Sequence, residues 1–240
     1  MSGPPFHIKA KPGDIAENVI AVGDPGRVKI LGELLDNYRI VNEHRGLLTI
    51  TGEYKGVQVT IATHGMGCPS AAIVFEELGM LGAKKIVRLG TAGGMREDLE
   101  IGDIVVATGA AYTCGGCGLG QYYTGYCAPT APDPILTYKI IEELSKKRIR
   151  FHTGPVFSSD AFYAEDPEFA RKWCEKGVIA VEMEAAILFA LGWMRKWKTA
   201  AVLVISDNLL TEKQYLATSE ELKEKIVIAA KAILEAFKNY

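Results

Sequence analysis

The sequence lacks the charge runs and long apolar runs that mark nucleic-acid-binding and membrane-spanning proteins. Its 27 Lys and Arg residues are spread along the chain, mostly singly, and 29 Asp and Glu residues bring the formal net charge to −2. Without a basic stripe or a polybasic arm, we expect neither nucleic acid nor a membrane as partner. No apolar run approaches the roughly 20 residues of a membrane helix, and no signal-peptide core is present. We therefore expect a cytoplasmic protein that binds a small neutral or anionic molecule.

Cysteine is also scarce. The five cysteines form an odd set without the spacing of a secreted disulfide framework. Cys114-Gly115-Gly116-Cys117 has the spacing of a redox or zinc motif, but no second Cys or His pair completes a zinc site. The flanking glycines favour a loop with a structural or incidental role, so we expect no metal. A disulfide in this loop, or one between subunits through Cys127, stays open.

Length and hydrophobic content favour one domain over residues 1–240. Of the 240 residues, 48% are hydrophobic, which is enough for one deep core, and no linker or repeat divides the chain. Runs rich in Val, Ile and Thr alternate with amphipathic stretches, which predicts an α/β fold with helices covering a sheet. Ligands are expected where strands end in glycine-rich loops. The expected strands are residues 19–22, 47–51, 57–63, 85–89, 104–108, 153–157, 178–181 and 200–205.

Several helix starts carry capping residues. Asp133 and Asp166 each precede a proline, a pairing typical of an N-cap followed by the first helical position. Thr218 and Glu221 have the spacing of a capping box before the last helix. The apolar residues of that helix recur at steps of three and four, so one face is expected to pack on the sheet.

The stretch Gly23-Asp24-Pro25-Gly26-Arg27 follows the apolar run at 19–22. Its glycines and proline predict a tight turn whose N–H groups can converge on an anion, and Arg27 adds charged donors. Such a turn can hold a phosphate without a metal. An ordinary strand-to-helix turn with a solvated arginine would have the same residues.

A second anion-binding pattern lies at the end of the expected strand 85–89. Arg88 is followed by Thr91, which stands between glycines, so a cationic fork lies near N–H and O–H donors. Two strand ends of this kind on one sheet could hold one phosphate. Arg88 could instead pair with a carboxylate of the core.

Two glutamates flank a methionine where a strand ends and a helix over residues 183–191 is expected to begin. Because an unpaired buried carboxylate is costly, Glu182 and Glu184 both need partners. Glu184 suits a two-oxygen grip on the hydroxyls of a sugar, with Met183 packing on the sugar's apolar face. Alternatively, both glutamates simply favour the positive end of the helix.

Two further segments follow expected strands. Asp207, in Ser206-Asp207-Asn208, would have a raised pKa beside an apolar pocket and could then act as a general acid. The same three residues could equally cap a helix or a turn. Phe162 and Tyr163 could stack on a flat base, although aromatic residues are more often part of a core.

Together these motifs resemble the hexameric nucleoside phosphorylases, which include purine nucleoside, uridine and archaeal 5′-methylthioadenosine phosphorylases. The order and spacing of the motifs, with the Asn42-Glu43-His44-Arg45-Gly46 segment among them, match over nearly the whole chain. The resemblance implies a central mixed β-sheet that forms a distorted barrel surrounded by helices. It also implies a hexamer built as a trimer of dimers, no cofactor, and inorganic phosphate as co-substrate.

The resemblance further implies a role for each candidate residue. Phosphate would be bound by Gly23, Arg27, Arg88, Thr91 and, from a neighbouring subunit, Arg45. Ribose would be held by Met183 and Glu184, with Glu182 nearby and His7 of the neighbour at the 5′ position. The base would stack on Phe162 near Ser206 and take a proton from Asp207.

The implied activity is phosphorolysis of purine nucleosides, with 5′-methylthioadenosine as a further candidate substrate, by a pentosyltransferase. The uridine-specific branch reads its base with a Gln and an Arg aligned to residues 162–166, and this chain has neither. The alternatives are a uridine phosphorylase, a nucleosidase of the same superfamily that attacks with water, and a nucleoside-binding protein without chemistry. Bacterial purine enzymes place an arginine after the acid, whereas residues 209–221 contain only Lys213 as a cation, so the activation of Asp207 stays open.

Overall fold

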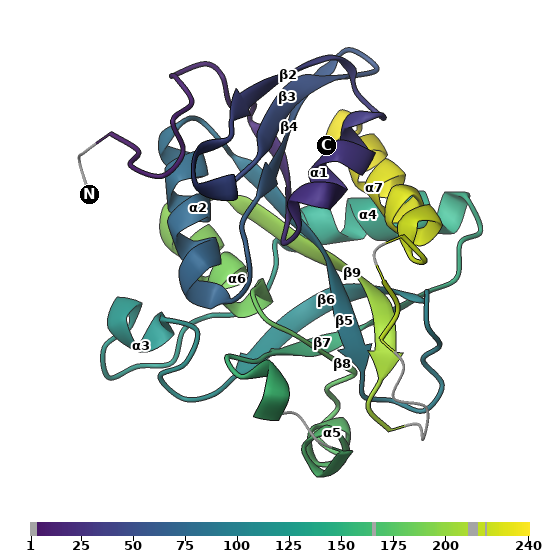
Figure 1. Ribbon diagram of the computed structural model, residues 1–240. Coiled ribbons are helices and arrows are strands. Elements are labelled where there is room, and N and C mark those ends of the chain that lie inside the picture. The colour runs from purple at the N-terminus through teal and green to yellow at the C-terminus, as the bar shows by residue number, and fades with distance from the viewer. Residues whose placement is uncertain (1–3, 165–166, 211–215, 219) are drawn as a thin grey trace.

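The computed structural model describes residues 4–164, 167–210, 216–218 and 220–240 (Figure 1). Its strands are β1 (Asn18–Val22), β2 (Asp36–Asn42), β3 (Thr49–Tyr54), β4 (Val57–Thr63), β5 (Lys85–Gly94), β6 (Ile104–Tyr112), β7 (Phe151–Ser158), β8 (Ala180–Glu182) and β9 (Lys198–Asn208). Its α-helices are α1 (Pro25–Gly32), α2 (Cys68–Met80), α3 (Leu119–Tyr122), α4 (Pro134–Lys146), α5 (Pro167–Cys174), α6 (Ala185–Arg195) and α7 (Lys223–Lys238), with 3₁₀ turns η1 (His44–Gly46) and η2 (Phe162–Ala164).

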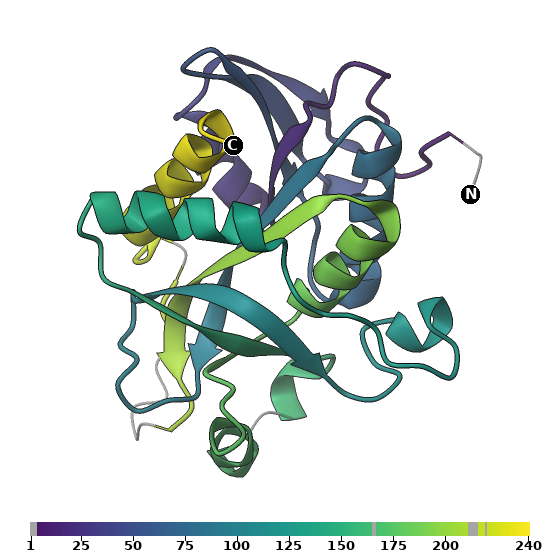
Figure 2. The same ribbon diagram turned by 180° about the vertical axis from the view of Figure 1, so that it is seen from behind.

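Part of the sheet closes on itself. The strand order is β2-β3-β4-β1-β5-β8-β7-β6-β9, and β5 also pairs with β9. Strands β5, β8, β7, β6 and β9 therefore form a closed ring, from which β1 to β4 extend as an open sheet (Figures 1 and 2). Strand β5 runs parallel to β1 and β9 but antiparallel to β8. The expected mixed sheet forming a distorted barrel is confirmed.

Helices cover the sheet on two sides. Helices α2 and α6 pack together on one side, and α1, α4 and α7 lie on the other (Figures 1 and 2). A separate apolar core fills each side. Strand β1 is buried along its whole length between these layers, which is why it reads as a continuous apolar run.

The predicted helix starts match the structure to different degrees. Asp133 caps α4 by accepting a hydrogen bond of 2.8 Å from the Leu136 N–H. Thr218 and Glu221 bond reciprocally, at 2.8 Å and 3.4 Å, in a turn that precedes α7. Asp166 lies outside the described residues, and α5 begins at Pro167.

Several strands run further than expected, and two of them, β5 and β9, carry candidate site motifs. The glycine-rich segment after Arg88 is part of β5 and not a loop, because Gly90 to Gly94 pair with β9. Ser206 and Asp207 likewise lie within β9. The expectation that these motifs form loops after their strands is therefore wrong, and the barrel wall itself carries them.

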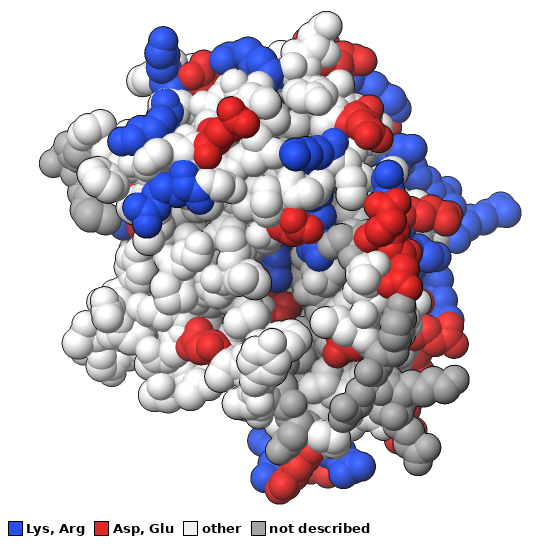
Figure 3. Space-filling model, viewed as in Figure 1, with Lys and Arg blue, Asp and Glu red and all other residues white. Residues whose placement is uncertain are grey.

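Surface charge is mixed on the face shown in Figure 3, where basic and acidic side chains alternate around a central hollow that holds both kinds. Within the described ranges, no helix combines the length and the apolar character needed to cross a membrane.

Candidate active site

A pocket of about 960 Å³ lies where β1, β5, β8 and β9 end. All the candidate site residues named from the sequence line it except His7: Gly23, Arg27, Arg45, Arg88, Thr91, Phe162, Glu182, Met183, Glu184, Ser206 and Asp207. These residues come from six separate segments of the chain. The fold therefore brings the predicted site together.

The turn after β1 places one cation in the pocket. Asp24 caps α1 by accepting from the Gly26 N–H at 2.8 Å, and Pro25 occupies the first helical turn. Arg27 is buried and donates to the Thr91 hydroxyl at 3.2 Å. Gly23 leaves room for the chain beside it, because a Cβ there would lie 3.2 Å from the Gly65 carbonyl oxygen. This turn thus joins β1 to the middle of β5.

Arg88 is a second buried cation, held mainly by carboxylates. Its Nε donates to Glu182 at 2.8 Å, and its Nη2 lies 2.6 Å from Glu184. Burial alone would lower the pKa of Arg88, but Glu184 and Glu182 raise it above its usual value. A Cβ at Gly90 would lie 2.3 to 2.7 Å from the guanidinium, so this position must be glycine for Arg88 to fit. Arg88 therefore forms the ion pair with buried carboxylates that the sequence offered as the alternative to anion binding.

The two arginines act on each other across the pocket. Burial, and then the charge of Arg88, lowers the pKa of Arg27. An anion between the two side chains would offset this repulsion. A guanidinium has five N–H donors, and three of those of Arg88 face Glu182, Glu184 and His64. Among the described residues, these contacts use one N–H of each terminal nitrogen of Arg88.

The two glutamates divide the roles that the sequence left open. Glu182 accepts from the N–H groups of Glu184 and Ala185 at 2.8 to 3.0 Å, so its carboxylate caps α6. It also accepts from the Ser158 hydroxyl, which in turn accepts from the Ala186 N–H at 2.9 Å. Of the two glutamates, Glu182 is therefore the one that interacts with the start of the helix. It also lines the pocket, where it binds Arg88.

Glu184 lies at the pocket wall and anchors a neighbouring loop. It accepts from the Gly67 N–H at 2.6 Å, a contact that depends on the left-handed φ of +83° at Gly67. Burial raises the pKa of Glu184. The helix expected from residue 183 begins instead at Ala185, because the backbone of Glu184 is not helical, with φ −144° and ψ −7°. The Glu184 side chain contacts Gly67 and Arg88.

A bulge turns two adjacent residues of β9 toward the same pocket. Side chains alternate between faces along a regular strand, so Ser206 and Asp207 would normally face opposite ways. The β5–β9 register shifts between Ala92 and Gly93, and both side chains line the pocket. The Ser206 hydroxyl donates to Asp207 Oδ1 at 2.8 Å. Burial nevertheless raises the pKa of Asp207 above its usual value.

The remaining candidates lie at the rim or outside. Phe162, on η2, is 49% exposed and lines the pocket. Arg45, on η1 with a φ of +58°, lines the pocket of its own chain, whereas the family resemblance implies that it serves a neighbour's pocket. His7 lies outside the pocket, where its Nδ1 is 2.7 Å from Glu77. The contributions of Arg45 and His7 across an interface stay predictions, and Lys213 lies outside the described residues.

Comparison with known proteins gives the family. The family model described as "Phosphorylase superfamily" matches residues 17–240. The chain belongs to this superfamily. It is 37% identical over 220 residues to a guanosine phosphorylase of Halorubrum lacusprofundi, which covers 91% of this chain and 90% of that protein. It is 41% identical over 234 residues to a DeoD-type purine nucleoside phosphorylase of Jannaschia sp., covering 96% and 97%.

Solved structures of the superfamily share the fold. A uridine phosphorylase of Vibrio fischeri superposes with a TM-score of 0.88 at 29% identity, covering 100% of this chain and 99% of that one. A purine nucleoside phosphorylase of Toxoplasma gondii in complex with immucillin-H gives a TM-score of 0.88 at 27% identity, covering both chains fully. The resemblance predicted from the motifs is confirmed.

His64, which the motifs did not single out, lies directly beside Arg88. His64 is fully buried, and its Nε2 lies 3.4 Å from Arg88 Nη1, while no hydrogen-bond partner of its Nδ1 lies among the described residues. Burial, and then the charge of Arg88, lowers the pKa of His64 well below its usual value. A neutral ring with its proton on Nδ1 can accept from Arg88. The signal was the His-Gly-Met-Gly run after β4, the same strand-then-glycine pattern as the other motifs.

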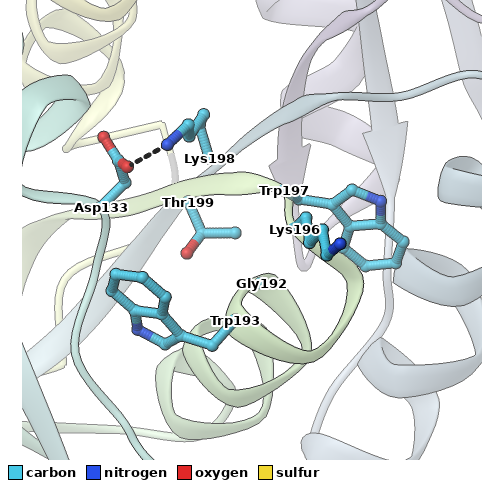
Figure 4. Close-up of a pocket in the computed structure, with 7 residues that line it drawn as sticks. All are labelled: Asp133, Gly192, Trp193, Lys196, Trp197, Lys198 and Thr199. Carbon is cyan, nitrogen blue, oxygen red and sulfur yellow. Dashed lines mark hydrogen bonds and ion pairs between the residues drawn. The ribbon is translucent and has the colours of Figure 1, made fainter.

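A second pocket, of about 160 Å³, lies apart from this chemistry (Figure 4). It is formed where α6 ends and β9 begins, between Trp193 and Trp197. Lys198 and Asp133, two of its three charged lining residues, pair with each other at 3.0 Å. This pair links β9 to the start of α4 and has a structural role.

Proposed function

We propose that this protein cleaves the N-glycosidic bond of purine nucleosides with inorganic phosphate, releasing the base and ribose 1-phosphate. The observation that carries the proposal is one pocket that holds Arg27 and Arg88 beside Glu184 and an Asp207 with raised pKa. This reaction needs cationic donors that bind phosphate, an acceptor for the two ribose hydroxyls, and a general acid. The similarity to a guanosine phosphorylase and to a DeoD-type purine nucleoside phosphorylase supports it.

Phosphate would bind between the two arginines. Cleaving the glycosidic bond builds positive charge on the sugar, and a phosphate held below C1′ stabilises that charge and attacks the carbon. Thr91 and the turn at Gly23 would add neutral donors. Glu184 would accept from the two ribose hydroxyls through oxygens that Arg88 and the Gly67 N–H already orient. Inorganic phosphate is a co-substrate here, and the proposed chemistry needs no cofactor.

Asp207 would supply the proton that lets the purine leave as a neutral base. A group is an effective acid when its pKa lies near the working pH, and burial shifts Asp207 in that direction. Phe162 would stack on the base from the exposed side of the pocket. We further propose a homo-oligomer, a hexamer built from dimers, in which Arg45 and His7 serve the neighbouring pocket.

The decisive experiment measures base release from inosine, guanosine, adenosine, 5′-methylthioadenosine and uridine, each with and without phosphate. We expect release from one or more purine nucleosides only when phosphate is present, with formation of the sugar 1-phosphate. Release without phosphate would identify a nucleosidase. A preference for uridine would identify a uridine phosphorylase, and binding without any product would identify a nucleoside-binding protein.

Replacing the acid tests the mechanism separately. Asp207→Asn should lower kcat for inosine by about 100-fold or more and change KM by only a few-fold, because the proton is needed in the transition state. Asp36→Asn, at an exposed position on β2, is the matched control and should leave both constants unchanged. Full turnover by the Asp207 variant would remove this residue from the acid role.

A further inference from the structure

Two buried thiols lie close together behind the wall of the pocket. Cys68 opens α2 and Cys117 lies in the loop before α3, and their exposed fractions are 0% and 1%. Their sulfur atoms and a carboxylate oxygen of Asp160 all lie within 4.8 Å of one another. The Cys68 thiol also donates to the Met183 carbonyl at 3.1 Å. The pair therefore joins two segments far apart in the chain, next to a residue that lines the pocket.

We propose that Cys68 and Cys117 form a disulfide that ties the start of α2 to the loop before α3. The two thiols lose two protons and two electrons as the S–S bond forms. The oxidant is a small-molecule disulfide, which takes up both electrons and both protons and leaves as two thiols. Exchange passes through a mixed disulfide, and it occurs while the chain folds, because the folded protein shields both sulfurs from solvent. This proposal is independent of the proposed function.

The surroundings favour a disulfide over a metal ion. The hydrogen bond with the Cys117 thiol, together with burial, raises the pKa of Cys68 far above its usual range, and Glu182 and Glu184 add to the shift. A metal would need both sulfurs as thiolates beside these two carboxylates. A disulfide is neutral, so it adds no charge to this acidic surrounding.

The loop presents Cys117 and not Cys114 to the interior. Cys114 is exposed, and its sulfur does not belong to the group that Cys117 forms with Cys68. The Cys117 N–H donates to Asp160 Oδ2 at 2.8 Å, which holds the loop against the segment after β7. Glycines on both sides of Cys117 let the loop absorb the movement that brings two contacting sulfurs to bonding distance.

The bond would brace two walls of the pocket. Cys68 follows Gly67, whose N–H holds Glu184, and Cys117 contacts the Ser158 carbonyl at 3.6 Å, at the end of β7. A disulfide here closes a loop of about 50 residues, long enough to restrict the unfolded chain strongly.

The test refolds the full chain in buffers of oxidised and reduced glutathione and maps the peptides by mass spectrometry. We expect a peptide pair linked through Cys68 and Cys117, lighter than the reduced pair by two hydrogens. The melting temperature of the oxidised protein should exceed that of the reduced protein by about 5–10 °C. This difference should persist in Cys174→Ser, a control on α5, and vanish in Cys68→Ala and in the paired Cys68→Ala/Cys117→Ala variant.

Three results would overturn the proposal. The first is that both thiols stay reduced in the most oxidising buffer, shown by alkylation of the unfolded protein. The second is a linked pair made of Cys114 and Cys117. The third is stoichiometric zinc, measured after dialysis of the reduced protein against Zn²⁺, that is lost in the Cys68→Ala variant. The paired alanine variant replaces both thiols with small apolar side chains, so it keeps the comparison valid if a single variant fails to fold.

Discussion

At the scale of single residues, Arg88 organises the pocket. A buried guanidinium needs nearby anions, and Arg88 has Glu182 and Glu184 within 2.8 Å. The sequence offers pairing with a core carboxylate and binding of an anion as alternatives for Arg88. In the structure Arg88 pairs with carboxylates and also lines the pocket. Contacts with Glu182, Glu184 and His64 fix its position, and the same side chain lines the pocket, so the buried ion pairs orient a candidate binding group.

The hydroxyl of Ser206 tunes Asp207, and removing it gives a pH prediction. Burial raises the pKa of Asp207, while the hydrogen bond from Ser206 lowers it. Ser206→Ala removes only the lowering contribution, so the pKa of Asp207 should rise further. Because the acid acts in its protonated form, kcat/KM falls as pH rises through this pKa. The alkaline limb of the profile should therefore move to higher pH in the variant.

The control for this shift is Ser159→Ala, which removes a hydroxyl outside the pocket that accepts from the Ala161 N–H at 3.3 Å. Its profile should match that of the unmodified protein. A Ser206→Ala profile that moved to lower pH, or did not move, would contradict the assigned hydrogen bond or the acid role of Asp207.

At the scale of elements, the start of α6 carries both stability and the site. Ser158, at the end of β7, donates to Glu182 and accepts from the Ala186 N–H. Ser158→Ala should lower the free energy of unfolding by about 1–2 kcal/mol, since it leaves a buried helix N–H without a partner. It should also raise KM for phosphate, because Glu182 loses one of the hydrogen bonds that fix its carboxylate against Arg88. Urea unfolding and initial-rate kinetics measure the two effects.

Thr137→Val provides the comparison. The Thr137 hydroxyl on α4 is buried, and the described residues offer it no hydrogen-bond partner, so its removal should leave stability unchanged or increase it. Equal losses in both variants would show that the network at α6 has no special weight.

The expected elements were most accurate where burial dominates. The apolar runs of β1 and β4 predict their strands well, because both strands are enclosed by helices. Strand β2 was missed because most of its residues are exposed and polar, so it has no apolar signal. The glycines after Arg88 suggested a loop, but they make room for Arg88 and for side chains of β9 within a barrel wall. Both β2 and the glycine-rich end of β5 are strands because they pair with β3 and β9, and these pairings leave no local signal in the sequence.

At the scale of the whole molecule, the pocket is assembled from the turn after β1 and from residues along β5, β8 and β9 that meet in one region of the fold. As the motifs predicted, their residues line one pocket, and the binding and catalytic roles assigned to them stay predictions. The motifs did not predict His64 or the bulge at Ser206, which depend on contacts across the barrel. Neither did they predict that Arg45 lines the pocket of its own chain.

The position of Arg45 makes the assembly testable by mixing two defective variants. Arg45→Ala and Asp207→Asn should each be weakly active alone. If Arg45 acts across the interface, a mixed dimer contains one intact pocket, with Asp207 from the first variant and Arg45 from the second. Mixing equal amounts after dissociation should then restore about a quarter of full activity, as expected for random pairing in a symmetric dimer.

If Arg45 instead serves the pocket it lines within its own chain, every pocket of the mixture keeps one defect. The activity of the mixture would then equal the mean of the two variants, and the assignment to a neighbour would be wrong. Mixing Asp207→Asn with Arg27→Ala provides the control, because Arg27 is buried beside Thr91 of its own chain and cannot reach another subunit. In the control mixture every pocket keeps the defect of its own chain, so no recovery of activity is expected. A recovery seen only when Asp207→Asn is mixed with Arg45→Ala therefore identifies a contribution of Arg45 across the interface.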